Sequence, residues 1–166
     1  MRSTLVLIMA ALLAGCSSPS SDGAGSPPLQ GARIGGPFAL VDQNGKNVKD
    51  TDFAGQYRLI YFGYTYCPDI CPIDAQKLMR GLAQFEKADP VRGAKVQPLF
   101  ITVDPERDNP ETLKAFVERY HPRLIGLTGT PEQVAEVTKS FAVVHNKQAG
   151  SAPDRYLVAH SQLSFL

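Results

Sequence analysis

The stretch RLIYFGYTYCPDICP, residues 58–72, decides the fold of this chain. It begins with a β-branched and aromatic run, which is typical of a strand buried at the centre of a sheet. Beyond it, as far as about Ala88, apolar residues recur at helical spacing, and Pro72 suits the first turn of a helix because its missing N–H is no loss there. The stretch therefore predicts a buried strand, a loop that holds Cys67 and Cys71, and a helix.

Strands and helices continue to alternate outward from this stretch. Upstream, two short strands within residues 38–48, with Asn44-Gly45 between them, predict a β-hairpin. Downstream, the pattern predicts strands over 96–103 and 124–127, helices over 109–120 and 130–140, a further strand over 141–145, a polar loop over 149–154 and a last strand over 156–166. Such alternation predicts an α/β fold whose sheet is mainly parallel.

Length and charge limit the classes of protein to which this chain can belong. Its 166 residues, of which 43% are hydrophobic, suffice for one globular core and not comfortably for two. The formal net charge is +1, so the sequence lacks the basic field that a nucleic-acid-binding protein needs. We expect one ordered domain and no nucleic-acid partner.

The N-terminus has the pattern of an export signal. Arg2 supplies a positive start, and the apolar residues 5–13 fall short of the roughly 20 that span a membrane. The sequence Leu-Ala-Gly-Cys, ending at Cys16, resembles a bacterial lipoprotein box; an ordinary secretory signal is the alternative. We expect a signal peptide over 1–15, a lipid on Cys16, a flexible Ser-, Gly- and Pro-rich tether over 16–37, and the ordered domain over 38–166.

The chemistry concentrates at the two cysteines that remain. Cys67 and Cys71 follow a central strand and open a helix, which is where ligands bind in open α/β sheets. Because the positive end of a helix dipole favours thiolates, both sulfurs are expected to ionise easily. Three kinds of site suit the pair: a structural disulfide closing a very small loop, a redox dithiol spaced one residue wider than Cys-x-x-Cys, and a site for a soft metal such as Cu(I).

A copper site with two thiolates needs at least one more ligand, and the chain has three histidines. His121 lies at a predicted helix end, where a capping or solvent-facing role is expected. His145 lies at a predicted strand end, where a surface or loop role is expected. His160 lies on or beside the last predicted strand, in an apolar segment, but its spacing does not link it to the cysteines. The residues alone leave the third ligand open.

Residues 62–72, FGYTYCPDICP, resemble the hallmark motif of the SCO/SenC family of exported, thioredoxin-fold copper proteins, which help to assemble cytochrome c oxidase. Residues 102–108, TVDPERD, and 125–130, IGLTGT, match the same family's pattern. The resemblance covers most of the chain from about Gly35 onward. It implies an α/β, thioredoxin-like fold with an N-terminal β-hairpin.

The resemblance also implies a metal site. Cys67 and Cys71 match the family's two thiolate copper ligands, and His160 matches its histidine ligand. This set suits both oxidation states of copper, since thiolates satisfy Cu(I) and imidazole binds either. Two carboxylates, Asp104 at the end of its strand and Asp69 inside the motif, are expected to support the site; a turn or capping role is the alternative for Asp104.

Two features depart from the family's pattern. The histidine is usually preceded by Asp, and here Ala159 fills that position, which is expected to weaken metal affinity or delivery. Family members also continue past the histidine strand with a further strand and a C-terminal helix, which we expect to be missing because this sequence ends at Leu166. The sheet would then have an unpaired edge and an exposed face, so a less stable, aggregation-prone domain is expected.

The function that the resemblance implies is that of a membrane-tethered copper chaperone in the bacterial cell envelope. It would receive copper from another exported chaperone and help to metallate the copper A centre in cytochrome c oxidase subunit II. The alternatives are a thiol-disulfide reductase acting on that subunit, which needs both cysteines but not His160, and a redox or copper sensor. A peroxidase is disfavoured because Thr65 lies two residues before Cys67, where peroxiredoxins have an offset of three.

Overall fold

The computed structural model of the chain describes residues 31–150 and 155–166. The expected signal peptide, the lipidated Cys16 and most of the expected tether fall outside these residues. All the helices and strands below belong to the unit Arg33–Leu166. Among the described residues, no helix combines the length and the apolar character that crossing a membrane requires.

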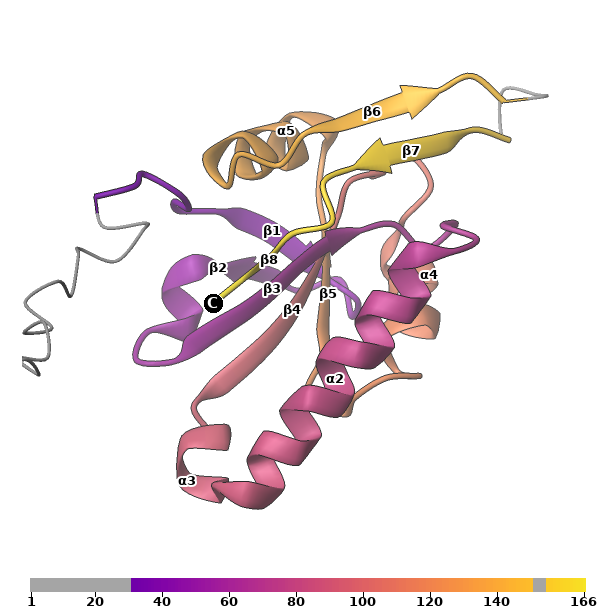
Figure 1. The fold of residues 1–166 in the computed structure, drawn as a ribbon. Helices are drawn as coiled ribbons and strands as arrows, with labels where there is room; N and C mark the ends of the chain where they lie inside the picture. The colour runs from indigo at the N-terminus through magenta and orange to yellow at the C-terminus, as the bar shows by residue number, and fades with distance from the viewer. Residues whose placement is uncertain (1–30, 151–154) are drawn as a thin grey trace, which may run out of the picture. The chain divides into compact units, whose positions relative to one another are not determined.

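A six-stranded sheet in the order β2-β1-β5-β4-β3-β8 forms the centre of the fold (Figure 1). In chain order its strands are β1 (Ala39–Asp42), β2 (Asn47–Lys49), β3 (Tyr57–Gly63), β4 (Val96–Thr102), β5 (Ile125–Thr128) and β8 (Ser164–Phe165). The predicted central strand is β3, which pairs with β4 along its whole length and buries its last four residues. The aromatic run therefore occupies the place that its composition predicts.

The pairing in this sheet is parallel only among the three central strands. β3 pairs with β4, and β4 with β5, in parallel, whereas β1-β2, β1-β5 and β3-β8 are antiparallel pairs. The expectation of a mainly parallel sheet is therefore wrong for both flanks. A tight turn at Gly45 (φ 78°) folds the chain back between β1 and β2 into the expected hairpin, and such a short connection permits only antiparallel pairing.

Three of the helices are those that the alternation predicts, and two short ones were not expected. The helices are the short 3-10 helix η1 (Asp50–Phe53) and the α-helices α2 (Ile70–Ala88), α3 (Pro90–Gly93), α4 (Pro110–Val117) and α5 (Pro131–Ser140). The side chains of Asn109 and Thr130 cap α4 and α5, each by accepting a hydrogen bond from a backbone N–H in the first turn, and each of these helices begins with proline. Local sequence signals thus account for where α4 and α5 begin.

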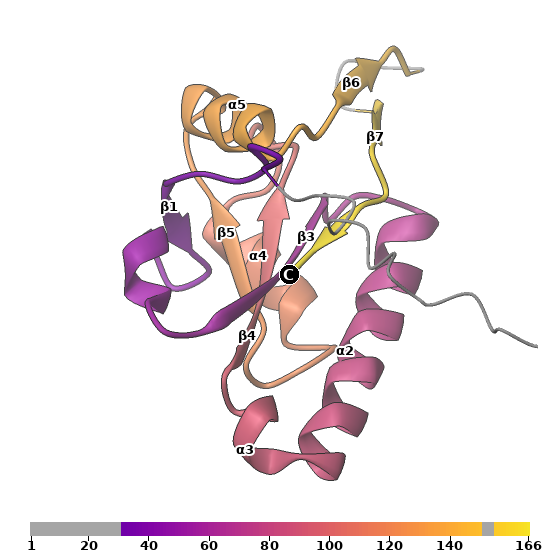
Figure 2. The ribbon, with the colours of Figure 1, turned by 60° about the vertical axis from the view of Figure 1, so that its left-hand side comes forward.

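Aromatic rings pack on both faces of the sheet. On one face, Phe100 of β4 lies 4.8 Å from Phe116 of α4 between ring centroids, and Tyr61 of β3 donates a hydrogen bond to Asp74 of α2. On the other face, Phe62 lies 5.4 Å from Phe141, at the end of α5. Figure 2 shows α2 and α5 on opposite sides of the central strands. With both faces covered, the loops at the ends of β3 and β4 are left to build a site.

A separate two-stranded antiparallel sheet joins β6 (His145–Gln148) to β7 (Leu157–His160) and lies apart from the main sheet in Figure 1. The strand expected over 141–145 begins only at His145, because a turn follows α5, with Ala142 in the left-handed region (φ 54°). The strand expected over 156–166 is two strands. β7 pairs with β6, and after residues 161–163 the chain pairs with β3 instead, as β8. A strand therefore does follow the histidine strand.

Candidate metal centre

The two cysteines lie on either side of the β3–α2 junction. Cys67 belongs to the loop that leaves β3, and its N–H donates to the Tyr64 carbonyl at 3.3 Å. Cys71 lies in the first turn of α2, is fully buried, and directs its own N–H at the Cys67 sulfur at 3.4 Å. The beginning of α2 therefore presents a backbone donor to one sulfur while it carries the other.

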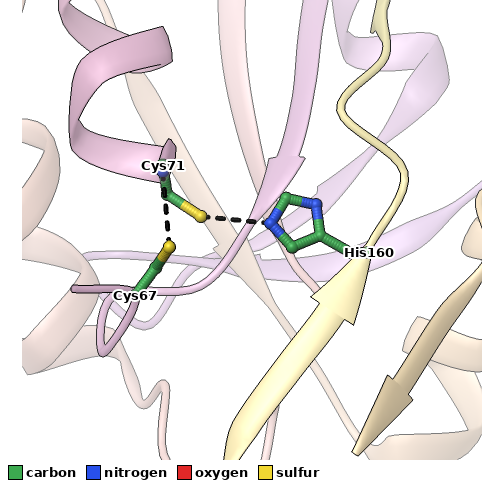
Figure 3. A group of neighbouring side chains, drawn as sticks. All are labelled: Cys67, Cys71 and His160. Carbon is green, nitrogen blue, oxygen red and sulfur yellow. Dashed lines mark hydrogen bonds between the residues drawn. The ribbon is translucent and has the colours of Figure 1, made fainter. Parts of the chain in front are cut away.

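His160 ends β7 and meets the cysteines from the opposite side (Figure 3). Its Nε2 lies 3.2 Å from the Cys71 sulfur, and its Nδ1 lies 3.0 Å from the Ser161 carbonyl oxygen. A carbonyl only accepts, so Nδ1 carries the ring proton and Nε2 presents its lone pair to the sulfur, which is the tautomer that a metal ligand needs. The donor atoms of Cys67, Cys71 and His160 all lie within 4.8 Å of one another.

Two tyrosines hold the imidazole between them. The rings of Tyr61 and Tyr64 meet His160 edge-on, at centroid separations of 6.3 and 6.0 Å. The Tyr64 hydroxyl also accepts a hydrogen bond from the N–H of Val158, two residues before the histidine on β7. These contacts limit rotation of the imidazole, so the orientation of Nε2 is set before any metal binds.

Burial controls the electrostatics of the centre. It raises the pKa of the Cys71 thiol well above its usual range, and the nearby sulfur of Cys67 adds to that shift. The expectation that both sulfurs ionise easily is therefore wrong for Cys71, because loss of solvent outweighs the helix dipole. A bound cation reverses this balance, since it stabilises the thiolate directly and displaces the proton.

The two carboxylates expected to support the site lie in different surroundings. Asp69 is exposed just before α2 and makes no capping hydrogen bond with its side chain. Asp104 is buried; its Oδ2 accepts from Arg107 Nε at 2.6 Å and its Oδ1 accepts from the Tyr156 hydroxyl at 2.7 Å. Neither carboxylate belongs to the group of converging donors found among the described residues.

The remaining histidines lie outside that group. His121 is buried against Glu86, with Nε2 to Oε2 at 3.2 Å, and its Nδ1 accepts from the backbone N–H of Arg123. The expected solvent-facing role is therefore wrong, because the ring is buried and contacts Glu86, although its hydrogen bond with the Arg123 N–H is of the capping kind. His145 lies opposite His160 in the β6–β7 pair and is half-buried; burial, and then the neighbouring His160, lower its pKa.

Sequence reasoning missed the residues around the ligands. The sequence pattern places Tyr61 and Tyr64 in or beside the buried strand and gives no sign that both flank the imidazole. No local pattern indicates Arg107 or Tyr156, although each contacts Asp104. A signal was present in the tyrosines at 61 and 64, which precede Cys67 in the predicted buried strand, since buried tyrosines usually have a polar partner.

One side of the centre is open. A hollow of about 270 Å³ is lined by both Cys67 and His160, with Pro68 and Leu157 on its walls. Cys71 lies behind them and is fully buried. The arrangement shields one thiol and leaves the other two donors accessible from the same direction.

The donor chemistry fits a soft metal ion. Metal bonds of about 2.0–2.3 Å to sulfur and imidazole nitrogen bring ligand atoms to within about 4 Å of one another. The three donor atoms already lie within 4.8 Å, so small side-chain movements suffice. Two thiolates and one imidazole favour Cu(I) or Zn²⁺ over hard cations. The expected ligand set thus converges, although 89 residues separate Cys71 from His160.

Known proteins share this fold and much of this sequence. The Arabidopsis thaliana ScoI structure with copper bound is 40% identical and covers 80% of each chain with a TM-score of 0.74. The Bradyrhizobium japonicum ScoI structure with copper bound is 42% identical and covers 79% of this chain and 80% of that one, with a TM-score of 0.72. These matches confirm the expected thioredoxin-like fold.

Family membership rests on sequence as well as on fold. The mitochondrial SCO2 homologue of Bos taurus is 45% identical over 139 residues, which cover 83% of this chain and 52% of that protein. The chain spans about half the length of the curated relatives it matches. The SCO1/SenC family model matches residues 26–166. This chain is a member of the SCO1/SenC family.

Proposed function

We propose that this protein is a copper chaperone that binds copper through Cys67, Cys71 and His160 and helps to metallate cytochrome c oxidase. The observation that carries the proposal is the convergence of two sulfurs and one imidazole nitrogen within 4.8 Å. Two similar solved structures hold copper, and the Sco family is a family of cytochrome c oxidase assembly proteins. The copper A centre of subunit II is the proposed recipient.

The geometry suits a carrier that must also release its cargo. Cys71, buried behind the site, loses its proton on binding and holds copper as a thiolate. Cys67 and His160 line the open hollow, so ligands of a partner can replace them from that side while Cys71 still holds the ion. Stepwise exchange of soft ligands keeps copper coordinated throughout the transfer.

The proposed location is the bacterial cell envelope, with a lipid on Cys16 as the anchor. A SCO1/SenC family lipoprotein from Bacillus anthracis, which is 26% identical and covers 77% of this chain with a TM-score of 0.64, supports this proposal. So does the Leu-Ala-Gly-Cys sequence. Mass spectrometry of the protein purified from bacterial membranes tests it: a Cys16→Ser variant should lose both the lipid mass and the membrane association.

Copper titration tests the ligand set directly. The full chain should bind one Cu(I), the Cys67→Ser and Cys71→Ser variants should lose tight binding, and His160→Ala should keep weakened Cu(I) binding but lose the Cu(II)–thiolate absorption of the parent. His121→Ala is the matched control, because His121 contacts Glu86 and lies outside the donor group. Unchanged stoichiometry and spectra in the cysteine and His160 variants would remove this site from the proposal.

A thiol-disulfide reductase is the second candidate. Both cysteines are free, the sulfur of Cys67 accepts a hydrogen bond from the Cys71 N–H, and a Sco protein 31% identical to this chain is described as having a disulfide switch. In this reaction, a Cys67 thiolate attacks the oxidised cysteine pair of the recipient, Cys71 then closes a Cys67–Cys71 disulfide, and the recipient leaves with two thiols. The reductase needs both cysteines and not His160, so the His160→Ala variant separates the two functions.

A further inference from the structure

The ligands of the candidate centre come from two parts of the fold. The cysteines belong to the main sheet and α2, whereas His160 belongs to the β6–β7 hairpin, which is a separate sheet. The distance between His160 Nε2 and the sulfurs therefore depends on contacts that join the hairpin to the main body. One buried contact is the hydrogen bond from the Val158 N–H to the Tyr64 hydroxyl, and the segment after β4, residues 103–108, supplies further buried contacts.

Arg107, from the main body, makes the central contact with the hairpin at this junction. Its Nη1 donates to the backbone oxygen of Tyr156 at 3.1 Å, and its guanidinium carbon lies 3.6 Å from the centroid of the Tyr156 ring. Tyr156 is buried and immediately precedes β7, four residues before His160. One guanidinium thus holds both the backbone and the ring of the residue from which the histidine strand begins.

The same guanidinium reaches the cysteine loop. It lies 4.9 Å from the ring centroid of Tyr66, which directly precedes Cys67, and 5.7 Å from that of Tyr64. Both distances fall within the range in which a cation is attracted to an aromatic face. Arg107 therefore stands between the loop that carries Cys67 and the strand that carries His160.

Asp104 holds the Arg107 guanidinium and the Tyr156 ring in place against each other. Its Oδ2 accepts from Arg107 Nε at 2.6 Å, and its Oδ1 accepts from the Tyr156 hydroxyl at 2.7 Å, so the three side chains close a ring of contacts. Burial, together with the hydrogen bond to Asp104, raises the pKa of Tyr156, so the phenol remains a donor. The side chains of Arg107 and Asp104 are only 14% and 4% exposed, so water does not compete for these bonds.

A second link between the same segments contributes less. Lys147 of β6 pairs with Glu106 at 2.7 Å, but the two side chains are 48% and 59% exposed. Exposed pairs contribute little because water screens them and the long side chains lose freedom. The buried ring of contacts therefore contributes more to the position of the hairpin than this exposed ion pair does.

We propose that Arg107, together with Asp104 and Tyr156, is a positioning group that sets the distance from His160 to the two sulfurs. The inference rests on the proposed function, since it concerns the same copper site. It assigns Asp104 its supporting role: the carboxylate acts through Arg107 and Tyr156 on the histidine strand, at a distance from the metal. Cu(II) binding, which relies on the imidazole, should depend on this group more than Cu(I) binding, which two thiolates can satisfy.

Arg107→Lys is the decisive variant, because lysine keeps the charge but loses the planar fork that binds backbone and carboxylate together. Arg123→Lys is the matched control. Arg123 makes a similar clamp away from the site, since it pairs with Glu86 and donates to the carbonyls of Gly93 and Ala94. The control should share any general cost of replacing a bridging arginine and should leave the copper centre unchanged.

Two measurements on the full chain decide the inference. In the metal-free protein, NMR contacts between the His160 and Tyr64 rings should weaken in Arg107→Lys and persist in Arg123→Lys. In the copper-loaded protein, Arg107→Lys should lose roughly tenfold or more in Cu(II) affinity. Adding Arg107→Lys to His160→Ala should cause no further loss, because both changes act on one ligand. If Arg107→Lys does not fold, Tyr156→Phe, which removes only the hydroxyl, should show a smaller shift in the same two measurements.

The outcomes separate this inference from the proposed function. Failure of the parent chain to bind copper would refute the proposed function, and the NMR contacts would still decide whether Arg107 positions His160. Copper binding by the parent with equal Cu(II) affinities in Arg107→Lys and Arg123→Lys would overturn the positioning role. If Arg107→Lys lowers copper affinity as much in the His160→Ala background as in the parent, the positioning role is overturned as well, since Arg107 would then act on something other than His160.

Discussion

Replacing Asp108 by alanine should strongly destabilise the domain. Asp108 is fully buried and accepts three hydrogen bonds, from the Thr65 N–H at 3.0 Å, the Thr65 hydroxyl at 2.6 Å and the Thr102 hydroxyl at 2.7 Å. Thr65 lies two residues before Cys67, so these bonds tie the cysteine loop to the end of β4. Asp108→Ala leaves all three donors without their acceptor.

The expected cost is the balance of two opposing effects. Hydrogen bonds to a charged group contribute about 1.5–3 kcal/mol each, so three lost bonds cost about 5–9 kcal/mol before relaxation. Burial raises the pKa of Asp108, because it disfavours the charged carboxylate. The hydrogen bonds from Thr65 and Thr102 favour the charged form and offset only part of this rise in pKa. Removing a buried charge returns a few kcal/mol, so we expect a net loss of about 3 kcal/mol, or about 10 °C in Tm.

Thermal and urea unfolding of the full chain measure this loss. Asp69→Ala is the matched control, because Asp69 lies in the same loop, is exposed and makes no capping hydrogen bond; it should shift Tm by no more than about 2 °C. The raised pKa of Asp108 also fixes a pH dependence. Its contribution is fully present below the unfolded pKa of about 3.9 and declines as pH rises through the folded pKa, so the deficit of the variant should widen on acidification from pH 7. A Tm shift no larger than that of the control would refute the reasoning.

Other predictions concern packing and acid stability. Gly63→Ala should cost about 1–3 kcal/mol and displace Cys71, because the added methyl would lie 3.1 Å from its sulfur; unfolding midpoints and copper spectra check this, and an unchanged spectrum would contradict it. Burial would raise the pKa of Glu86, but hydrogen bonds and charge from Arg123 and His121 lower it overall. The stabilisation lost in Glu86→Gln should therefore be present at pH 7 and vanish as pH falls through the folded pKa, so urea midpoints of parent and variant should converge in acid. Phe165→Ala should lower Tm, because its ring packs on two others at 5.8 and 5.2 Å; equal melts would show that β8 adds nothing to stability.

Much of the fold could be predicted from local patterns. The aromatic run became β3, the Asn44-Gly45 turn closed the β1–β2 hairpin, and proline with a capping side chain marked the beginnings of α4 and α5. These features depend on neighbours in the chain, so periodicity and turn chemistry reveal them. The region beyond Phe141 was predicted less well. There the chain first forms the β6–β7 hairpin and then, between His160 and Ser164, changes partner to pair with β3 as β8, and no local pattern encodes such a change of partner.

The candidate site divides in the same way. The cysteine pair and its place at the strand–helix junction follow from the sequence alone, because strand, loop and helix are consecutive. The resemblance to a family, carried by long motifs, named His160 as the third ligand. The residues alone left it open, since no spacing connects positions 71 and 160.

Tertiary structure decided what the sequence could not. It brought His160 Nε2 to 3.2 Å from the Cys71 sulfur, buried that thiol so deeply that its pKa rises, and placed Arg107 between the cysteine loop and the histidine strand. The physical reason is that the chemistry of a ligand depends on the type of residue, which the sequence gives directly. Distance, burial and the partners of a buried charge are set only when segments far apart in the chain pack against one another.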